Sequence, residues 1–191
     1  MTSDPAAAGA AAPPCVVVSG VSGVGKSTVA RLLAERLRVP FADADDFHPP
    51  ASIARMAAGV PLDDEDRGPW LRSVGAWLGA RLADGTGGVV ACSALSRSHR
   101  DLLRADCPGA YVLQLNGGRE LVADRIGRRT GHFMPAVLLD SQYALLEPLA
   151  DDEYGSTLDV GPAPEVLADT AARRLAAAGG GTRRSGPGAG R

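Results

Sequence analysis

The chain has 191 residues, of which 45% are hydrophobic and 22% are charged, and its formal net charge is −2 at pH 7. A chain of this length forms one domain and buries roughly 70% of its unfolded surface, so it needs no disulfide staples. The small net charge gives no bulk attraction to nucleic acid or to a membrane, and no apolar run approaches the ~20 residues of a membrane-spanning helix. The N-terminus also lacks the basic segment followed by an apolar one that marks a secretory signal. We therefore expect a cytoplasmic protein that binds neither nucleic acid nor membranes.

The two ends of the chain differ in composition from its middle. Residues 1–14 are mostly Ala, Gly and Pro, and residues 179–191 are rich in Gly with scattered arginines. Neither segment carries enough apolar surface to offset the entropy lost on ordering, so we expect disordered tails around a domain at residues 15–178. The three cysteines lack metal-type spacing, and two of them lie in apolar runs, which indicates reduced thiols in the core.

The first patterned stretch predicts a nucleotide site. Residues 15–18 form a short apolar run typical of a buried strand, and apolar residues recur at helical spacing from Lys26 onward. Between them, residues 20–27 read Gly-Val-Ser-Gly-Val-Gly-Lys-Ser, which has the form GxxxxGK[ST]. Glycines in such a loop let backbone N–H groups surround phosphate oxygens, and the following helix adds its unpaired N–H groups and its positive dipole end. The sequence therefore predicts a binding site for a nucleoside triphosphate.

Two side chains of this loop have distinct roles in phosphate chemistry. Lys26 can reach the β- and γ-phosphates, and the hydroxyl of Ser27 can ligate Mg²⁺. Lys26 is the only lysine in a chain with nineteen arginines, so a compact ammonium stands where a planar guanidinium would fit poorly. The alternative, a chance glycine-rich turn, leaves the succession of strand, loop and helix unexplained. The predicted nucleotide-binding residues are Gly20, Val21, Ser22, Gly23, Val24, Gly25, Lys26, Ser27 and Thr28.

After the loop, strand-like and helix-like stretches alternate, which is the pattern of a parallel sheet covered by helices. The further strands are expected at residues 41–43, 88–93, 110–115 and 157–160. The helices are expected at residues 26–38, 53–58, 97–105, 120–129, 135–149 and 165–178, with one more that begins at Pro69, a residue suited to a first helical turn. We therefore predict an α/β, three-layer P-loop fold with a five-stranded parallel sheet and helices on both faces.

The acceptor of the phosphoryl group is predicted at the second strand. Asp43-Ala44-Asp45 ends that strand, and ligands of open parallel sheets bind beyond the carboxyl ends of the strands. We expect one carboxylate, Asp43, near the metal ion and the other, Asp45, on the hydroxyl that is phosphorylated. The alternative is a charged turn, since Asp is common in turns.

Five further blocks carry a family resemblance. They are residues 43–49 (Asp-Ala-Asp-Asp-Phe-His-Pro), 64–71 (Asp-Glu-Asp-Arg-Gly-Pro-Trp-Leu), 92–95 (Cys-Ser-Ala-Leu), 131–134 (Gly-His-Phe-Met) and 141–142 (Ser-Gln). Together with the phosphate loop they resemble the gluconokinase family, small P-loop kinases of the nucleoside-monophosphate-kinase fold, from about Val16 to Ala178. The resemblance implies ATP-dependent phosphorylation of D-gluconate at its 6-hydroxyl to 6-phospho-D-gluconate, with ATP and Mg²⁺ as cofactors. It also implies a homodimer, since family members are often dimers.

The resemblance also implies which residues form the site. Arg125 and Arg129 match the family's lid arginines within residues 119–134, and with Lys26 and Asp45 they are the expected catalytic residues. A sugar acid needs a cation for its carboxylate and polar groups for its hydroxyls. The substrate-binding residues, in and after a segment at about 45–66, are expected to be Asp45, His48, Arg55, Arg67, Ser93, Arg97, His132 and Gln142. Which arginine binds the carboxylate stays open, and for each of them a surface salt bridge is the alternative, as a structural role is for His132.

Three departures from the family pattern affect the substrate side. Ala44 replaces a glycine, which requires a negative φ at this position. Ser52 replaces an asparagine, and Ser96 replaces a lysine, so Arg97 must reach the substrate in the lysine's place. Trp70 is expected in the core rather than as a stacking surface.

Three other functions share part of this pattern. A shikimate-type kinase would share the paired aspartates, but its Gly-Gly-Gly motif is missing after the third strand. A GTPase-type switch needs an Asn/Thr-Lys-x-Asp motif, which a chain with Lys26 as its only lysine cannot contain. A non-catalytic ATP-binding regulatory module would leave Asp45 and the lid arginines unexplained.

Overall fold

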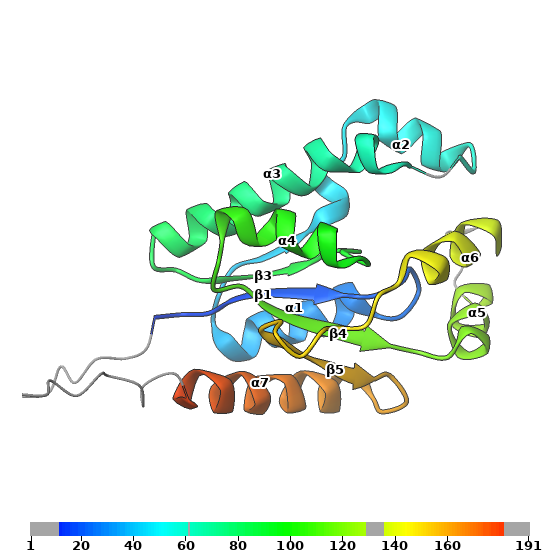
Figure 1. The fold of residues 1–191 in the computed structure, drawn as a ribbon. Helices are drawn as coiled ribbons and strands as arrows, with labels where there is room; N and C mark the ends of the chain where they lie inside the picture. Colours follow the sequence, from blue (N-terminus) through cyan, green and yellow to red (C-terminus); the bar gives the residue numbers. More distant parts are fainter. Residues whose placement is uncertain (1–11, 61, 129–135, 182–191) are drawn as a thin grey trace, which may run out of the picture.

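The structure is a computed structural model that describes residues 12–60, 62–128 and 136–181. Its centre is a five-stranded parallel sheet with the strand order β2-β3-β1-β4-β5 (Figure 1). The strands are β1 (Cys15–Ser19), β2 (Phe41–Asp43), β3 (Gly88–Ala91), β4 (Tyr111–Asn116) and β5 (Gly155–Asp159). All four pairings in the sheet are parallel, which confirms the predicted fold class.

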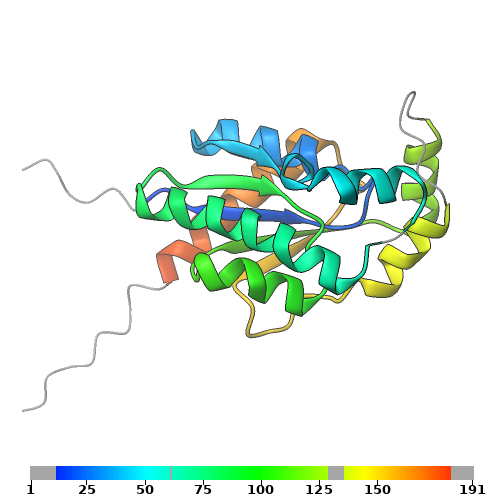
Figure 2. The same cartoon turned by 90° about the horizontal axis from the view of Figure 1, so that it is seen from above.

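Helices cover both faces of the sheet and extend past one end of it. Helices α1 and α7 pack on one face, and α3 and α4 pack on the other (Figure 1). Helices α2, α5 and α6 lie toward the carboxyl ends of the strands (Figures 1 and 2). The helices are α1 (Lys26–Leu37), the 3₁₀ helix η1 (Ala44–Phe47), α2 (Pro50–Ala57), α3 (Asp64–Ala83), α4 (Arg97–Asp106), α5 (Arg119–Gly127), α6 (Ala136–Leu145) and α7 (Pro164–Gly181).

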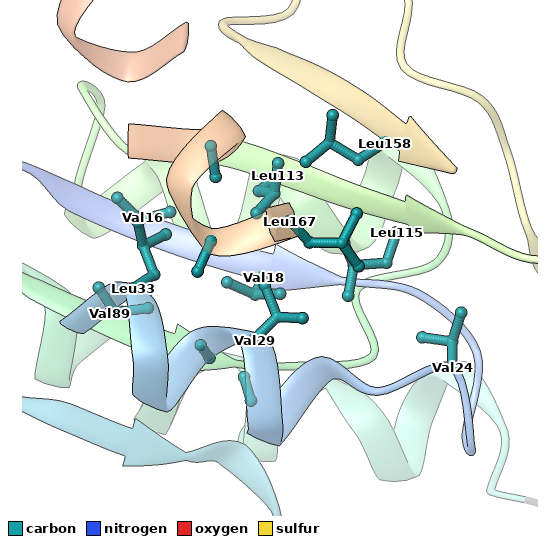
Figure 3. Packing of buried hydrophobic residues seen from close by; sticks show 14 of the residues in the cluster. Val16, Val18, Val24, Val29, Leu33, Val89, Leu113, Leu115, Leu158 and Leu167 are labelled. Atoms are coloured by element: carbon teal, nitrogen blue, oxygen red, sulfur yellow. The ribbon is translucent and has the colours of Figure 1, made fainter. Parts of the chain in front are cut away.

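The core is divided by the sheet into two layers. Alternate residues of the central strand β1 point to opposite faces, so Val16 and Val18 pack with α1 and α7 (Figure 3), while Val17 packs with α3. These three valines are 0% exposed, which explains why β1 reads as a continuous β-branched run. All three cysteines are free and buried, as expected. No helix in the described ranges is long and apolar enough to cross a membrane.

Helix α3 begins five residues before the predicted start at Pro69. A capping box begins it: the Asp66 N–H donates to Asp63 Oδ1 at 2.9 Å, and the Asp63 N–H donates to Asp66 Oδ2 at 3.3 Å. Pro69 therefore lies inside the helix, where it removes only the bond to the Glu65 carbonyl. The prediction of a helix start at Pro69 was wrong because the local capping signal is stronger than the proline signal.

Boundaries elsewhere also differ from the prediction by a few residues, as the ends of α6 and α7 illustrate. Helix α6 ends at Leu145 instead of residue 149, because the Glu147 N–H donates to the Leu95 carbonyl and no longer continues the helix. Helix α7 continues to Gly181, so residues 179–181, expected in the tail, are helical.

Candidate active site

The phosphate loop connects β1 to α1 with glycines at positions that other residues could not occupy. A Cβ on Gly20 would lie 2.6 Å from the Leu115 carbonyl oxygen. Gly25 has a φ of 107° and is the N-cap of α1, where no side chain accepts a hydrogen bond from the first turn. The first turn also lacks acidic residues. The N-terminus of α1 is therefore arranged for an anionic ligand instead of a capping side chain.

The loop and the end of the edge strand β2 meet through a hydroxyl and a carboxylate. Ser27 Oγ donates to Asp43 Oδ2 at 2.7 Å, and Lys26 Nζ donates to the Val21 carbonyl at 3.0 Å. Hydroxyl and carboxylate oxygens suit Mg²⁺, which usually keeps several waters and phosphate oxygens as ligands. In the described part of the chain no group of three or more His, Cys, Asp or Glu side chains could hold a metal. A hydroxyl and a carboxylate at this place fit an ion whose other ligands are waters and phosphate oxygens.

Asp45 lies in η1, directly after β2. The Asp45 N–H donates to Asp43 Oδ1 at 3.2 Å, and the Asp45 side chain is exposed. Lys26, Asp43 and Asp45 all act electrostatically on the buried thiol of Cys92, whose pKa is raised to about 12, chiefly by burial. All three charges are therefore close enough to affect a thiol at the carboxyl end of β3. Among the described non-glycine residues only Arg38 has a positive φ, so Ala44 meets the predicted condition.

His48 and Arg67 lie beside Asp45. The His48 ring stacks on Trp70, with centroids 4.2 Å apart and ring planes 10° apart. Burial lowers the pKa of His48, the charge of Arg67 lowers it further, and the charge of Asp45 opposes the shift. Arg67 is 9% exposed, and its Nε donates to the Leu62 carbonyl at 3.0 Å. An imidazole with a lowered pKa and a buried guanidinium therefore adjoin the carboxylate.

Two other predicted arginines are engaged in ion pairs. Arg55 pairs with Asp66, and the Arg97 guanidinium donates two bonds of 2.7 Å to the Asp152 carboxylate. This pairing raises the pKa of Arg97 above its usual range. The structure thus directs Arg97 toward the loop before β5. Ser96 is the N-cap of α4, where its Oγ accepts from the His99 N–H at 3.3 Å.

Gln142 and Ser93 also lie near the loop or the strand ends. Gln142 Oε1 accepts a hydrogen bond of 2.6 Å from the Ser22 N–H, so its side chain contacts the phosphate loop. Ser93 follows Cys92 at the carboxyl end of β3 and is half-buried. Thr28, in the first turn of α1, is exposed.

Beside the loop, Arg125 of α5 borders a cavity. Its guanidinium donates to the Val160 carbonyl at 2.7 Å and to the Val24 carbonyl at 3.3 Å. The cavity has a volume of about 360 Å³ and is lined by Gly23, Val24, Gly25, Thr28, Val29, Arg125, Arg128, Pro162, Pro164 and Leu167. Sequence reasoning missed the residues after β5, although their Gly-Pro-Ala-Pro turn marks a loop at the carboxyl edge of the sheet. The predicted residues Arg129 and His132 lie outside the described residues.

A phosphate loop whose serine bonds an aspartate at the end of β2, with a second aspartate two residues further on, has the arrangement of a small P-loop kinase. The family model described as shikimate kinase matches residues 22–153. A gluconokinase of Gluconobacter oxydans is 48% identical over 141 residues, which cover 74% of this chain and 79% of that protein. The solved gluconokinase of Sinorhizobium meliloti 1021 is 39% identical with a TM-score of 0.81, covering 91% of this chain and 99% of that one. A solved sugar kinase of Janibacter sp. HTCC2649 is 48% identical with a TM-score of 0.82, covering 85% and 94%. The chain belongs to the gluconokinase family.

Proposed function

We propose that the protein transfers the γ-phosphoryl group of ATP to the 6-hydroxyl of D-gluconate, with 6-phospho-D-gluconate and ADP as products. The observation that carries this proposal is the 2.7 Å bond from Ser27 to Asp43, which joins the loop to the strand that leads to Asp45. The donor and acceptor halves of the site are thereby brought to one edge of the sheet. The names of the relatives support gluconate as the acceptor.

The donor side is formed by the loop and the cavity beside it. The N–H groups at the start of α1 bind the phosphates, and the Lys26 ammonium turns from the Val21 carbonyl to the β- and γ-phosphates. The cavity between the loop and Pro162 and Pro164 accommodates the adenosine group. Ser27 and Asp43 would hold Mg²⁺, which supplies charge neutralisation and alignment of the phosphates when bound.

The acceptor side is formed by η1 and α3. Asp45 accepts the proton of the 6-hydroxyl as the oxygen attacks the γ-phosphorus. Arg67 is the arginine we assign to the sugar acid's carboxylate, because it is buried near His48 and its orientation is fixed by the Leu62 carbonyl. Arg125, and Arg129 by family resemblance, neutralise charge on the moving phosphoryl group.

Gluconate-dependent ADP release tests the function directly. The purified protein is incubated with ATP, Mg²⁺ and gluconate, ADP is followed by an enzyme-linked assay, and the product is identified by ³¹P NMR. We expect Asp45→Ala to lower kcat ~10²-fold or more with little change in ATP affinity. Asp46→Ala removes an exposed carboxylate from the same 3₁₀ helix and serves as the matched control. Absence of gluconate-dependent ADP release would refute the proposed function.

The family model gives a reason to include shikimate among the acceptors. The panel therefore compares gluconate, shikimate and glucose at equal concentrations. Because glucose lacks the carboxylate, Arg67→Met should lower kcat/KM for gluconate and reduce the preference for gluconate over glucose. Arg55→Met, which removes a more exposed arginine, should have the smaller effect.

A further inference from the structure

The 3₁₀ helix η1, which carries Asp45, is contacted at both ends by one residue, Trp70 of α3. Trp70 Nε1 donates to the Ala44 carbonyl at 2.6 Å, and its ring stacks on His48 at the other end of η1. Trp70 is 2% exposed, so both contacts are shielded from water. Burial in the core was predicted for this residue, but burial alone does not require either contact.

The contact with Ala44 fixes the peptide unit that precedes Asp45. The Ala44 carbonyl and the Asp45 N–H belong to the same peptide plane. The carbonyl accepts from Trp70, and the N–H donates to Asp43 Oδ1 at 3.2 Å. With both polar groups bonded, the plane cannot rotate without breaking a hydrogen bond. The direction in which the Asp45 side chain leaves the backbone is therefore set by Trp70 and Asp43 together.

The contact with His48 fixes the other end of η1. The His48 N–H donates to the Asp45 carbonyl at 3.3 Å, and the ring lies parallel to the indole. His48 Nδ1 is buried and has no hydrogen-bond partner among the described residues. The titratable groups that act on this ring are Asp45 and Arg67, while burial has the largest effect and lowers its pKa. The stack on Trp70 therefore sets the orientation of this ring, which is one of the predicted substrate-binding side chains.

A four-residue 3₁₀ helix has weak internal hydrogen bonds, so its position depends on outside contacts. We propose that Trp70 is a positioning residue for phosphoryl transfer, which orients Asp45 through the Ala44 carbonyl and orients His48 through ring stacking. This inference rests on the proposed function, because it takes Asp45 as the proton acceptor. The indole N–H orients Asp45 and the indole face orients His48, so the two roles can be tested separately.

Trp70→Phe tests the hydrogen bond, because phenylalanine keeps an aromatic face and lacks the N–H. We expect kcat with gluconate to fall about 10- to 100-fold, because Asp45 would no longer be held in its reactive position. KM for ATP should stay within about twofold. Trp77→Phe is the matched control: Trp77 lies two turns further along α3, is partly buried, and its ring packs against Gly88, the first residue of β3. We expect Trp77→Phe to keep the kcat of the unmodified protein.

Trp70→Leu tests the stacking in addition. Losing the indole exposes the His48 ring to water, so its pKa rises toward the ordinary value. As the pH is lowered, His48 is then protonated at a higher pH than in the unmodified protein. If activity needs the neutral ring, the acid limb of the kcat/KM profile shifts to higher pH. In Trp70→Phe the stack is kept and the limb should stay in place.

A purely structural Trp70 gives a different result. Both Trp70 variants would then lower the melting temperature, yet kcat and the acid limb, measured well below that temperature, would match those of Trp77→Phe. That outcome overturns the inference. Should Trp70→Phe fail to fold, 3-benzothienylalanine at position 70, in which sulfur replaces the N–H within a ring of similar size, removes the donor alone and must lower kcat likewise. The unmodified protein and Trp77→Phe report separately whether gluconate is phosphorylated at all, so failure of the proposed function is recognised independently.

Discussion

Two arginines of α4, three residues apart, form equally short ion pairs in opposite environments. Arg100 donates two bonds of 2.7 Å to the Glu153 carboxylate, and both side chains are 0% exposed. Arg97 donates two bonds of 2.7 Å to Asp152, and these side chains are 43% and 66% exposed. Replacing each arginine by methionine therefore compares a buried ion pair with an exposed one at nearly constant geometry.

The structure sets the magnitude expected for each substitution. Arg100 uses all five of its N–H donors, because it also donates to the carbonyls of Leu95, Glu147 and Pro148. Arg100→Met leaves a buried carboxylate without its main partner, which costs ~3–5 kcal/mol of unfolding free energy. Arg97→Met removes an exposed pair and costs about 0–1 kcal/mol. For a chain of this size the first loss lowers the melting temperature by roughly 6–20 °C.

Chemical denaturation of the two variants checks these magnitudes. Midpoints and slopes in urea give the change in unfolding free energy, and calorimetry gives the melting temperature. The double variant Arg100→Met with Glu153→Met should recover part of the loss, since it removes a buried carboxylate whose remaining charged partner is Arg104, 2.8 Å from Glu153 Oε1. Equal costs for Arg97→Met and Arg100→Met would refute the reasoning that burial decides the contribution of an ion pair here.

Four other predictions follow from single contacts. Pairing with Arg100 lowers the pKa of Glu153 to about 2, so the stabilisation by this ion pair is complete above pH 4.5 and is lost as the pH falls toward 2. Glu153→Gln should therefore make acid unfolding, followed by circular dichroism, less steep between these two pH values. Gln142→Glu places a carboxylate beside the phosphate loop and should raise KM for ATP about tenfold or more, whereas Gln142→Met should change it less. Asp43→Asn should raise the Mg²⁺ concentration for half-maximal activity by roughly 10- to 100-fold in a magnesium titration at fixed ATP. Arg125→Met should lower kcat by ~10³-fold with a smaller effect on ADP affinity measured by calorimetry.

The sequence predicted what short-range patterns determine. The residues of the loop from Gly20 to Ser27 have a fixed spacing because the backbone must turn around a phosphate group. The structure places this loop between β1 and α1, as expected. The start of α3 differs from the prediction although its capping box is also local, because the box at Asp63 and Asp66 begins the helix five residues before the Pro69 position that the proline pattern favours. In this case the information was present in four consecutive residues.

The remaining features depend on residues that are distant in sequence. Nothing local distinguishes Arg97 from Arg100, since their partners lie about fifty residues later and only the tertiary fold buries one pair. The cavity wall formed by Pro162 and Pro164 contacts a loop that precedes it by about 140 residues. The burial of Trp70 was predicted correctly. The acceptor of its indole N–H is the Ala44 carbonyl, which lies in a different element of the fold.

Asp43 connects the two halves of the site, which explains why the two aspartates are separated by a single residue. One carboxylate oxygen of Asp43 accepts from the Ser27 hydroxyl at 2.7 Å, and the other accepts from the Asp45 N–H at 3.2 Å. A side chain at the end of β2 can accept from the second residue after it only in a tight turn, and η1 supplies that turn. Trp70 bonds the opposite side of the same peptide unit at 2.6 Å. Movement of Ser27, of Asp45 or of α3 would therefore disturb the same short series of hydrogen bonds, which holds the proposed donor and acceptor groups in place through contacts made by the protein itself.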